Sequence, residues 1–300
     1  MPSELRTWHE AFCQHCLVMK RQSPYTVRGY RDTLNSFVKY TGAAALADVT
    51  LAKVESWIMT GTTQCQWSPV TSRGRIKYMI LFAKWLVSRG HLESNPLEGI
   101  SLPSIPKKIP RSLSREQAEQ LLRFARNFSF QTEFEGARAY AILATFIYTG
   151  IRKRELRELE LRDVDLENGI LAVREGKGAK DRMVAIPPQL ALVLREYLKH
   201  RRSPRYQQLP YFFVGATALG GVGNEAIRRL VKKLRDASGI YFAPHMLRHT
   251  YATLMLEGGC DLFSLSKLLG HADIKTTTVY LSASVRHLQK EVLKHPVVVH

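Results

Sequence analysis

The stretch from Asn95 to Arg111 divides the chain, because its prolines exclude regular structure. The prolines are Pro96, Pro103, Pro106 and Pro110. Proline has no backbone N–H and its ring clashes with the preceding helical turn, so neither a helix nor a central strand can run through this stretch. Lys107 and Lys108 lie among the prolines. We therefore predict a basic linker over residues 96–111, between an N-terminal domain over residues 1–95 and a second domain over residues 112–300.

The charge of the chain favours a polyanionic partner. It has 44 Lys and Arg residues against 26 Asp and Glu residues, a formal net charge of +18. Basic side chains that neutralise phosphates gain free energy from the release of condensed counterions, so nucleic acid is the expected partner. With 45% hydrophobic residues in a chain of 300, each domain can bury a core. The chain has no apolar run of about 18 residues and no secretory signal pattern, so we expect a cytoplasmic, nucleoid-associated protein with no membrane segment.

Two amphipathic helices are predicted in the N-terminal domain. The first begins at Ser23-Pro24 and ends at Gly42, and the second runs from about Thr71 to Ser88. The basic positions outside their apolar stripes include Arg28, Arg31, Arg73, Arg75 and Lys77. One basic face could simply be solvated, but two in one small helical domain favour contacts with DNA phosphates, to which Lys107 and Lys108 of the linker would add.

The cysteines do not form a recognisable framework. Cys13, Cys16, Cys65 and Cys260 are too few and too scattered for a set of disulfides. Cys13 and Cys16 have the spacing of half a zinc site, but no second pair of ligands lies at a suitable distance. We interpret them as small apolar residues on an N-terminal helix, and we expect no bound metal.

The second domain is predicted to be mainly helical with a small β-hairpin. Ser114 and Gln117 form a capping box that opens it. The segment from Ala139 to Tyr148 is almost wholly apolar and predicts a buried helix that ends at Gly150. Two short alternating segments, 170–174 and 182–186, flank a glycine-rich turn that contains Lys177.

Three further helices are expected near the carboxyl end. Pro244 begins a helix on which His245 and Arg248 share one face, so both side chains can address one phosphate. The next helix begins after Asp261 and ends at Gly270, which brings His271 to its carboxyl end. A short last helix after Asp273 would present Tyr280.

Each of these residues alone has an ordinary explanation, but together they resemble the signature of the tyrosine site-specific recombinases of the phage integrase family, particularly Xer-like, transposon and phage integrase members. The matching segments are Thr149-Gly150-Ile151-Arg152 with Glu155-Leu156, Gly176-Lys177-Gly178, His245-x-x-Arg248-His249-Thr250, Leu269-Gly270-His271, and Thr276-Thr277 ahead of Tyr280. The resemblance covers nearly the whole chain, including a helical core-binding domain at the N-terminus. It implies a two-domain recombinase architecture.

The resemblance implies that Tyr280 attacks a DNA phosphodiester, giving a 3′-phosphotyrosyl link and a free 5′-hydroxyl. Arg152 and Arg248 would stabilise the transition state, because planar guanidiniums bind the charged equatorial oxygens in a bidentate manner. The tyrosine has a reference pKa of about 10 and needs help to ionise, and His245 is the candidate base or phosphate-positioning group. His271 would donate a hydrogen bond to the phosphate. Lys177 would protonate the leaving oxygen, with Lys180 of the same turn as the alternative. No cofactor, ATP or metal is implied.

Double-stranded DNA with a specific site and a homo-tetramer on two duplexes are the implied partners. Beyond Tyr280, an apolar stripe of Val285, Leu288 and Val292 precedes a tail of valines. This segment could close its own domain, but the resemblance implies instead that it docks on a neighbouring protomer in a ring of four on two duplexes. Whether an accessory protein or a second recombinase takes part is also open.

Two other functions compete with site-specific recombination. A type IB topoisomerase shares this chemistry but relaxes supercoils without exchanging strands, and a catalytically silent relative would only bind DNA. The intact set of Arg152, Lys177, His245, Arg248, His271 and Tyr280 argues against a silent binder. The short chain, with its linker and tail, argues against a topoisomerase.

Overall fold

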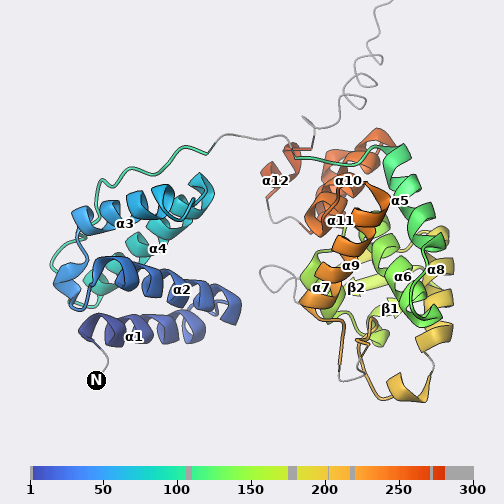
Figure 1. Ribbon diagram of the computed structural model, residues 1–300, viewed down its shortest axis with the longest axis horizontal. Coiled ribbons are helices and arrows are strands. Elements are labelled where there is room, and N and C mark those ends of the chain that lie inside the picture. Colours follow the sequence, from blue (N-terminus) through green and yellow to red (C-terminus); the bar gives the residue numbers. More distant parts are fainter. Residues whose placement is uncertain are drawn as a thin grey trace, which may run out of the picture. The chain divides into compact units, whose positions relative to one another are not determined.

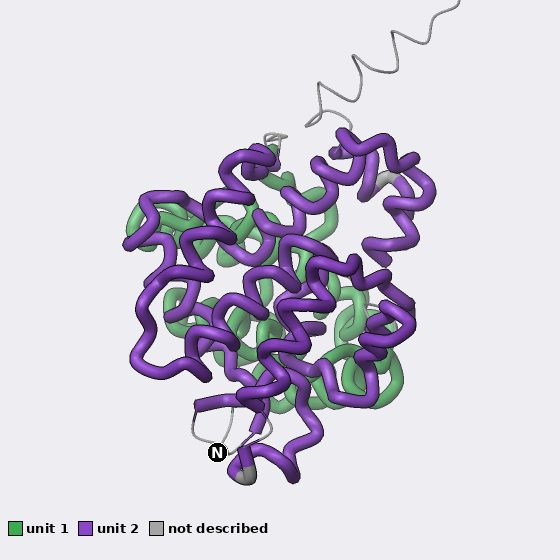
Figure 2. The backbone as a smooth tube through the Cα atoms, turned by 90° about the vertical axis from the view of Figure 1, so that its right-hand side faces the viewer, with its two compact units in different colours: residues 1–107 green, residues 108–300 purple. Residues whose placement is uncertain are grey.

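The computed structural model describes residues 3–105, 110–174, 181–201, 203–216, 220–270 and 273–280. The chain forms two compact units, Met1–Lys107 and Lys108–His300 (Figure 2). The expectation of a mainly helical protein with one small sheet is confirmed (Figure 1). Among the described residues, no helix combines the length and the apolar character needed to cross a membrane.

The first unit is built from helices. They are α1 Glu4–Val18, α2 Pro24–Thr41, α3 Leu51–Thr63 and α4 Pro69–Ser88, with a 3-10 turn at Leu46–Asp48. As predicted, the Ser23 hydroxyl caps α2 by accepting a hydrogen bond from the Thr26 N–H, and Gly42 ends the helix in a left-handed conformation. Helix α4 begins at Pro69, slightly before the predicted Thr71, because Ser68 caps it and proline suits the first helical position.

Several of the largest side chains in the core of the first unit are aromatic. Phe12, Phe37, Trp57 and Phe82 are among its fully buried side chains. The prediction that Cys13 and Cys16 are apolar residues on an N-terminal helix is confirmed, since α1 buries both. In the described part of the chain, no group of potential ligands could hold a metal ion.

The second unit surrounds one buried helix. Its helices are α5 Arg115–Asn127, α6 Glu133–Thr149, α7 Lys153–Glu158, α8 Pro188–Arg201, α9 Asn224–Ser238, α10 Pro244–Glu257, α11 Leu262–Leu269 and α12 Lys275–Thr278, with 3-10 turns at Leu161–Asp163 and Pro204–Tyr206. Helix α6 packs against α5, α8 and α10. It is longer than the apolar segment that predicted it, because Thr132 caps a first turn carrying Glu133 and Glu135. As predicted, it ends at Gly150.

The sheet has three antiparallel strands in the order β1 Val164–Asp165, β2 Ile170–Val173 and β3 Arg182–Ala185. Strands β2 and β3 pair as the predicted hairpin, with Val173 opposite Arg182. Residues 175–180 between them lie outside the described residues. Strand β3 begins with Arg182, which follows Lys177 by five positions in the sequence.

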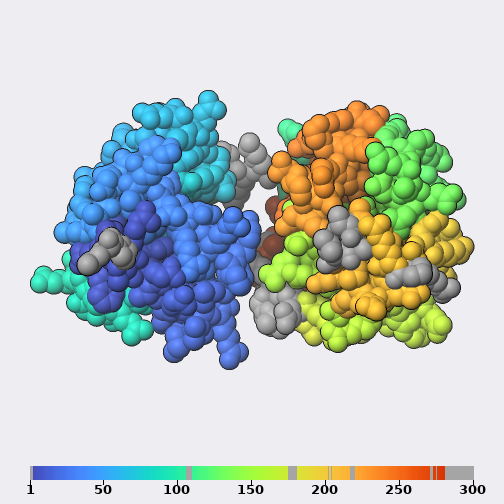
Figure 3. Space-filling view, turned by 60° about the horizontal axis from the view of Figure 1, so that its bottom comes forward, coloured from blue at the N-terminus to red at the C-terminus, as the bar shows by residue number. Residues whose placement is uncertain are grey.

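The start of the second unit is attached to α10. The backbone N–H of Leu113 donates a 2.9 Å hydrogen bond to the Thr250 hydroxyl. In the space-filling view, the green segments near residue 120 and the orange segments near residue 250 lie side by side on the surface of this unit (Figure 3). Residues far apart in sequence thus build one continuous body around α6.

Candidate active site

Arg152 lies at the point where α6 has ended and α7 begins. Gly150 adopts a left-handed backbone conformation with φ 59°, which turns the chain so that Arg152 becomes the residue before the first turn of α7. The backbone N–H of Arg152 donates to Oε2 of Glu155 at 2.8 Å, and its Nη1 donates to Oε1 at 2.7 Å. The half-buried guanidinium is thus held at the start of α7.

Arg248 is the most deeply buried cation of the site. Its residue exposure is 4%, and its terminal nitrogens donate to the carbonyl of Gly150 at 2.7 Å and to the carbonyl of Leu269 at 2.6 Å. Burial, followed by the nearby charge of Arg152, lowers the pKa of Arg248 to about 10. The guanidinium remains protonated at neutral pH and joins the ends of α6 and α11.

Glu155 is a buried carboxylate between two guanidiniums. Besides Arg152, it accepts hydrogen bonds of 2.9 Å and 2.7 Å from the two terminal nitrogens of Arg182. Burial alone would raise its pKa, but the hydrogen bonds and charge of Arg182, together with those of Arg152, lower the pKa to about 2. Glu155 is therefore ionised throughout the neutral range.

Tyr280 follows α12 and is 3% exposed. Its ring belongs to a small apolar cluster with Tyr251, Leu265 and Leu269, and its hydroxyl lies 3.1 Å from Nδ1 of His249. Burial raises the pKa of Tyr280, while the positive charges of Arg248 and Arg152 oppose that rise. The phenol is thus protonated at neutral pH and lies within the electrostatic influence of both arginines.

His245 lies in the first turn of α10, among positive charges. Partial burial, followed by the charges of Arg248, Lys153 and Arg152, lowers its pKa. The ring is therefore neutral at pH 7 and able to accept a proton. In this structure, however, the imidazole beside the Tyr280 hydroxyl belongs to His249, one turn further along α10.

The structure therefore brings Arg152, His245, Arg248 and Tyr280 close enough for the two arginine charges to shift the pKa of His245 and of Tyr280. Lys177 and His271 lie outside the described residues. Three further residues of the cluster had no predicted role. Glu155 and His249 were within the matching segments, whereas Arg182 was noted only as the start of an alternating strand, where a charged residue beside apolar ones was the available signal.

The basic residues predicted to bind DNA have different environments in the first unit. Arg28 and Lys77 are exposed. Arg31 forms a 2.6 Å ion pair with Glu10. Lys107 and Lys108 lie outside the described residues.

Arg73 and Arg75 are engaged within the first unit. Nη1 of Arg73 donates to the carbonyl of Pro103 at 3.0 Å. The guanidinium of Arg75 lies 3.6 Å from the ring centroid of Trp67 and donates to the Ser36 hydroxyl at 2.7 Å. A cation over an indole face gains from the ring quadrupole, so Arg75 stabilises the fold of this unit.

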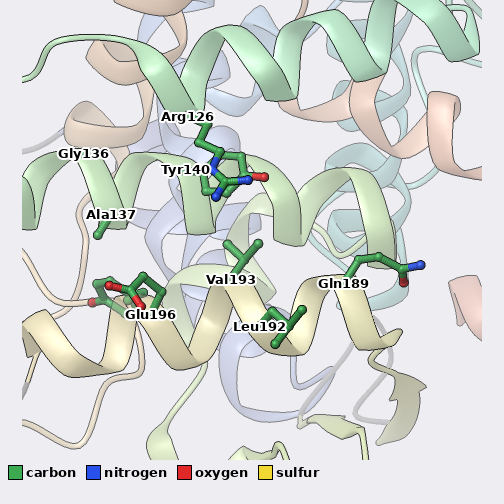
Figure 4. Close-up of a pocket in the computed structure, with 9 residues that line it drawn as sticks. Arg126, Gly136, Ala137, Tyr140, Gln189, Leu192, Val193 and Glu196 are labelled. Atoms are coloured by element: carbon green, nitrogen blue, oxygen red, sulfur yellow. The ribbon is translucent and has the colours of Figure 1, made fainter.

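A hollow of 590 Å³ lies elsewhere on the second unit. Tyr140 of α6, Leu192 and Val193 of α8, and Arg126 of α5 contribute to its lining (Figure 4). No residue of the cluster around Tyr280 lines it. This hollow is thus separate from the candidate active site.

Residues 111–287 match the phage integrase family. The chain belongs to that family. Tyrosine recombinase XerC of Oceanobacillus iheyensis is 30% identical over 304 residues, which cover 98% of this chain and 97% of the relative. The crystal structure of XerA recombinase is 28% identical with a TM-score of 0.55, covering 98% of this chain and all of that one. The protein is thus a Xer-like tyrosine recombinase.

A third comparison supports the fold of this recombinase. The XerH site-specific recombinase bound to a palindromic difH substrate has a TM-score of 0.73 and is 21% identical, covering 95% of this chain and 83% of that one. At this level of identity the likeness concerns the fold alone. It agrees with the confirmed two-domain recombinase architecture.

Proposed function

We propose that this protein is a site-specific recombinase that cleaves and rejoins double-stranded DNA through a covalent 3′-phosphotyrosyl intermediate on Tyr280. The family to which the chain belongs supports recombinase chemistry. The observation that carries the proposal is the placement of the Tyr280 hydroxyl under the influence of the guanidiniums of Arg152 and Arg248. A nucleophile and two cations are what attack on a phosphodiester requires.

Arg152 and Arg248 stabilise the transition state. Phosphoryl transfer spreads negative charge over the equatorial oxygens, and guanidiniums held in advance meet that charge without reorganisation. Both side chains are held by protein acceptors: Arg152 by Glu155, and Arg248 by two backbone carbonyls. Lysine could not reproduce either arrangement, because an ammonium lacks the planar fork.

In the cleavage step the phenolic oxygen of Tyr280 forms a bond to phosphorus and the bond from phosphorus to the 5′-oxygen breaks. His245 accepts the phenolic proton or orients the phosphate, for which its lowered pKa leaves it neutral. Lys177 protonates the leaving 5′-oxygen and His271 donates to the phosphate. Attack by the 5′-hydroxyl of the partner strand reverses the step. Because the phosphotyrosyl link conserves the energy of the broken bond, the reaction requires neither ATP nor a divalent cation.

His249 holds the nucleophile before DNA arrives. Its Nδ1 lies 3.1 Å from the Tyr280 hydroxyl, whose ring is packed in the apolar cluster. Because Tyr280 is 3% exposed, its hydroxyl must leave the apolar cluster to reach a phosphate while it stays close to Arg152 and Arg248. The DNA-free chain is thereby kept from reacting.

Residues 1–95 form the core-binding DNA domain, residues 96–111 the basic linker and residues 112–300 the catalytic domain with its C-terminal interaction tail. Arg28 and Lys77, which are exposed, are the leading phosphate contacts in the first of these domains. Four protomers act on two duplexes. The tail beyond Tyr280 docks on a neighbouring protomer, so removal of residues after Lys290 spares duplex binding and abolishes recombination.

A cleavage assay tests this function. A duplex that the protein binds is first selected from random DNA, and a nicked suicide form is then incubated with the protein in EDTA. A covalent adduct is expected with wild type and with Tyr241→Phe, an exposed tyrosine, but not with Tyr280→Phe. Absence of the wild-type adduct would indicate a silent binder. Relaxation of supercoils without joining between two duplexes would indicate a topoisomerase.

A further inference from the structure

We propose that Arg182 is a positioning residue of the active site, which sets the orientation of both Arg152 and Arg248 without touching the DNA. The inference rests on the proposed function. Arg182 is the first residue of β3, and its side chain is only 9% exposed. Burying a guanidinium to this degree carries a large desolvation penalty, which only well-placed hydrogen-bond partners can offset.

The first connection runs through Glu155 to Arg152. Arg182 binds both carboxylate oxygens of Glu155, at 2.9 Å and 2.7 Å. Among the described residues, the guanidinium of Arg152 makes a single hydrogen bond, to the oxygen that Nη1 of Arg182 also contacts. Arg182 therefore occupies the bidentate edge of the carboxylate. Arg152 is held in place, yet most of its N–H groups remain available to a phosphate.

The second connection runs through α11 to Arg248. Nε of Arg182 donates to the carbonyl of Leu268 at 3.2 Å, and the next carbonyl, of Leu269, accepts from Arg248 at 2.6 Å. These adjacent acceptors lie at the carboxyl end of α11. Gly270 makes the approach possible, since a Cβ there would lie 2.6 Å from Cδ of Arg182.

The charges of the cluster explain why an arginine is needed. Glu155 and Arg152 alone would form a neutral pair, and the attraction of Arg152 for a phosphate would be weakened. With Arg182 as the second cation, the group of three retains one net positive charge beside Arg248. Removing Arg182 would free Glu155 to bind Arg152 through both oxygens and draw it away from the substrate.

The test compares DNA binding with single-turnover cleavage of the suicide duplex in EDTA. The variants are Arg182→Met and Arg182→Lys, with Arg174→Met as the matched control, because Arg174 is exposed and paired with Asp163 beside the same sheet. Arg182→Met is expected to bind DNA as wild type does and to cleave about 100-fold more slowly, the scale typical of losing one preorganised donor. Arg182→Lys should recover only part of the rate, and Arg174→Met should cleave normally.

Two further readouts distinguish positioning from simple structural damage. The second duplex carries an uncharged methylphosphonate in place of the scissile phosphate. On this duplex the ratio of the wild-type cleavage rate to the Arg182→Met rate should be smaller, because the reacting group carries less negative charge for the arginines to stabilise. In a Glu155→Gln background, Arg182→Met should lower the cleavage rate by a smaller factor than in the wild-type background, because no carboxylate can then draw Arg152 away. If Arg182→Met does not fold by circular dichroism, Arg182→Lys is judged on the same two readouts.

Normal cleavage by both Arg182 variants, or equal losses on the phosphate and methylphosphonate duplexes, would overturn the positioning role while leaving the recombinase function intact. Absence of any adduct with the wild-type protein would instead overturn the proposed function. The two failures are therefore distinguishable.

Discussion

The guanidinium of Arg248 donates a 2.7 Å hydrogen bond to the carbonyl oxygen of Gly150. This contact joins α10 to the turn from which Arg152 projects, so the two arginines share one backbone support. The position of Arg248 therefore depends on the conformation of Gly150 as well as on its own helix.

Replacement of Gly150 by alanine should disturb the site. Its backbone has φ 59°, and a Cβ would lie 2.4 Å from Cδ1 of Tyr251. We expect Gly150→Ala to destabilise the protein by about 3 kcal/mol, from the left-handed backbone together with overpacking against a buried ring. Cleavage should fall as the carbonyl that holds Arg248 shifts. Denaturant unfolding followed by circular dichroism and the suicide-duplex assay measure the two effects.

Gly239→Ala is the control for this prediction. Gly239 has φ 69°, but a Cβ there meets nothing within 4 Å. This substitution should cost only about 1 kcal/mol, the contribution of the backbone conformation, and leave cleavage unchanged. Equal costs for the two alanines would show that the contact with Tyr251 is unimportant.

Lysine in place of Arg152 or Arg248 should suppress cleavage far more than DNA binding. An ammonium cannot donate in two directions from a planar fork, so we expect a loss of about 100-fold or more in the single-turnover rate. Arg154→Lys serves as the control, since Arg154 is exposed and pairs with Glu158 on the outside of α7. Parallel losses of binding and cleavage would mean that the arginines serve chiefly as phosphate anchors.

His9 should make the first unit sensitive to acid. Burial among aromatic rings lowers its pKa from 6.5 to about 4. Between pH 6.5 and 4, His9 is protonated in the unfolded chain but neutral in the folded unit. Its contribution to the free energy of unfolding is therefore fully present above pH 6.5 and is lost as the pH falls towards 4. The expected loss is about 3 kcal/mol over this window.

Tryptophan fluorescence can follow that loss in the intact chain. Trp8, Trp57, Trp67 and Trp85, the four tryptophans of the protein, all lie in the first unit. His9→Phe retains an aromatic ring and should flatten the pH dependence. An unchanged slope in this variant would assign the acid sensitivity to other groups.

Basic residues of the first unit should fall into two classes in DNA binding. Arg28→Ala and Lys77→Ala, at exposed positions, should each reduce the slope of log affinity against log salt by about 0.9. Arg75→Ala should leave the slope unchanged and instead lower the free energy of unfolding, because Arg75 stacks on Trp67. A reduced slope for Arg75→Ala would show that it leaves the indole to bind phosphate.

Many helix ends were predictable because their determinants are local. Ser23 and Asp261 cap helices through hydrogen bonds to N–H groups three residues away, and Gly42, Gly150 and Gly270 end helices in left-handed conformations. Such signals involve a few neighbouring residues and survive in most tertiary contexts. The hairpin was predictable for the same reason, from alternation on both sides of a glycine-rich turn.

The partners of the charged residues were not predictable in this way. Glu155 on α7 and Arg182 on β3 are separated by 27 positions, and only the folded chain brings the two side chains together as a bidentate pair. Likewise, the sequence does not show which histidine of α10 lies beside the Tyr280 hydroxyl. In the folded chain it is His249. Arg75 was expected to face DNA, yet the folded position of Trp67 offers it an aromatic surface.

The sequence by itself determined where the elements begin and end and, through its motifs, which side chains carry the chemistry. Only the tertiary structure decided which cation is held by which acceptor and whether the nucleophile is exposed. The physical reason is range: capping and alternation act between near neighbours, whereas the contacts of a buried guanidinium or phenol depend on how distant segments pack around it.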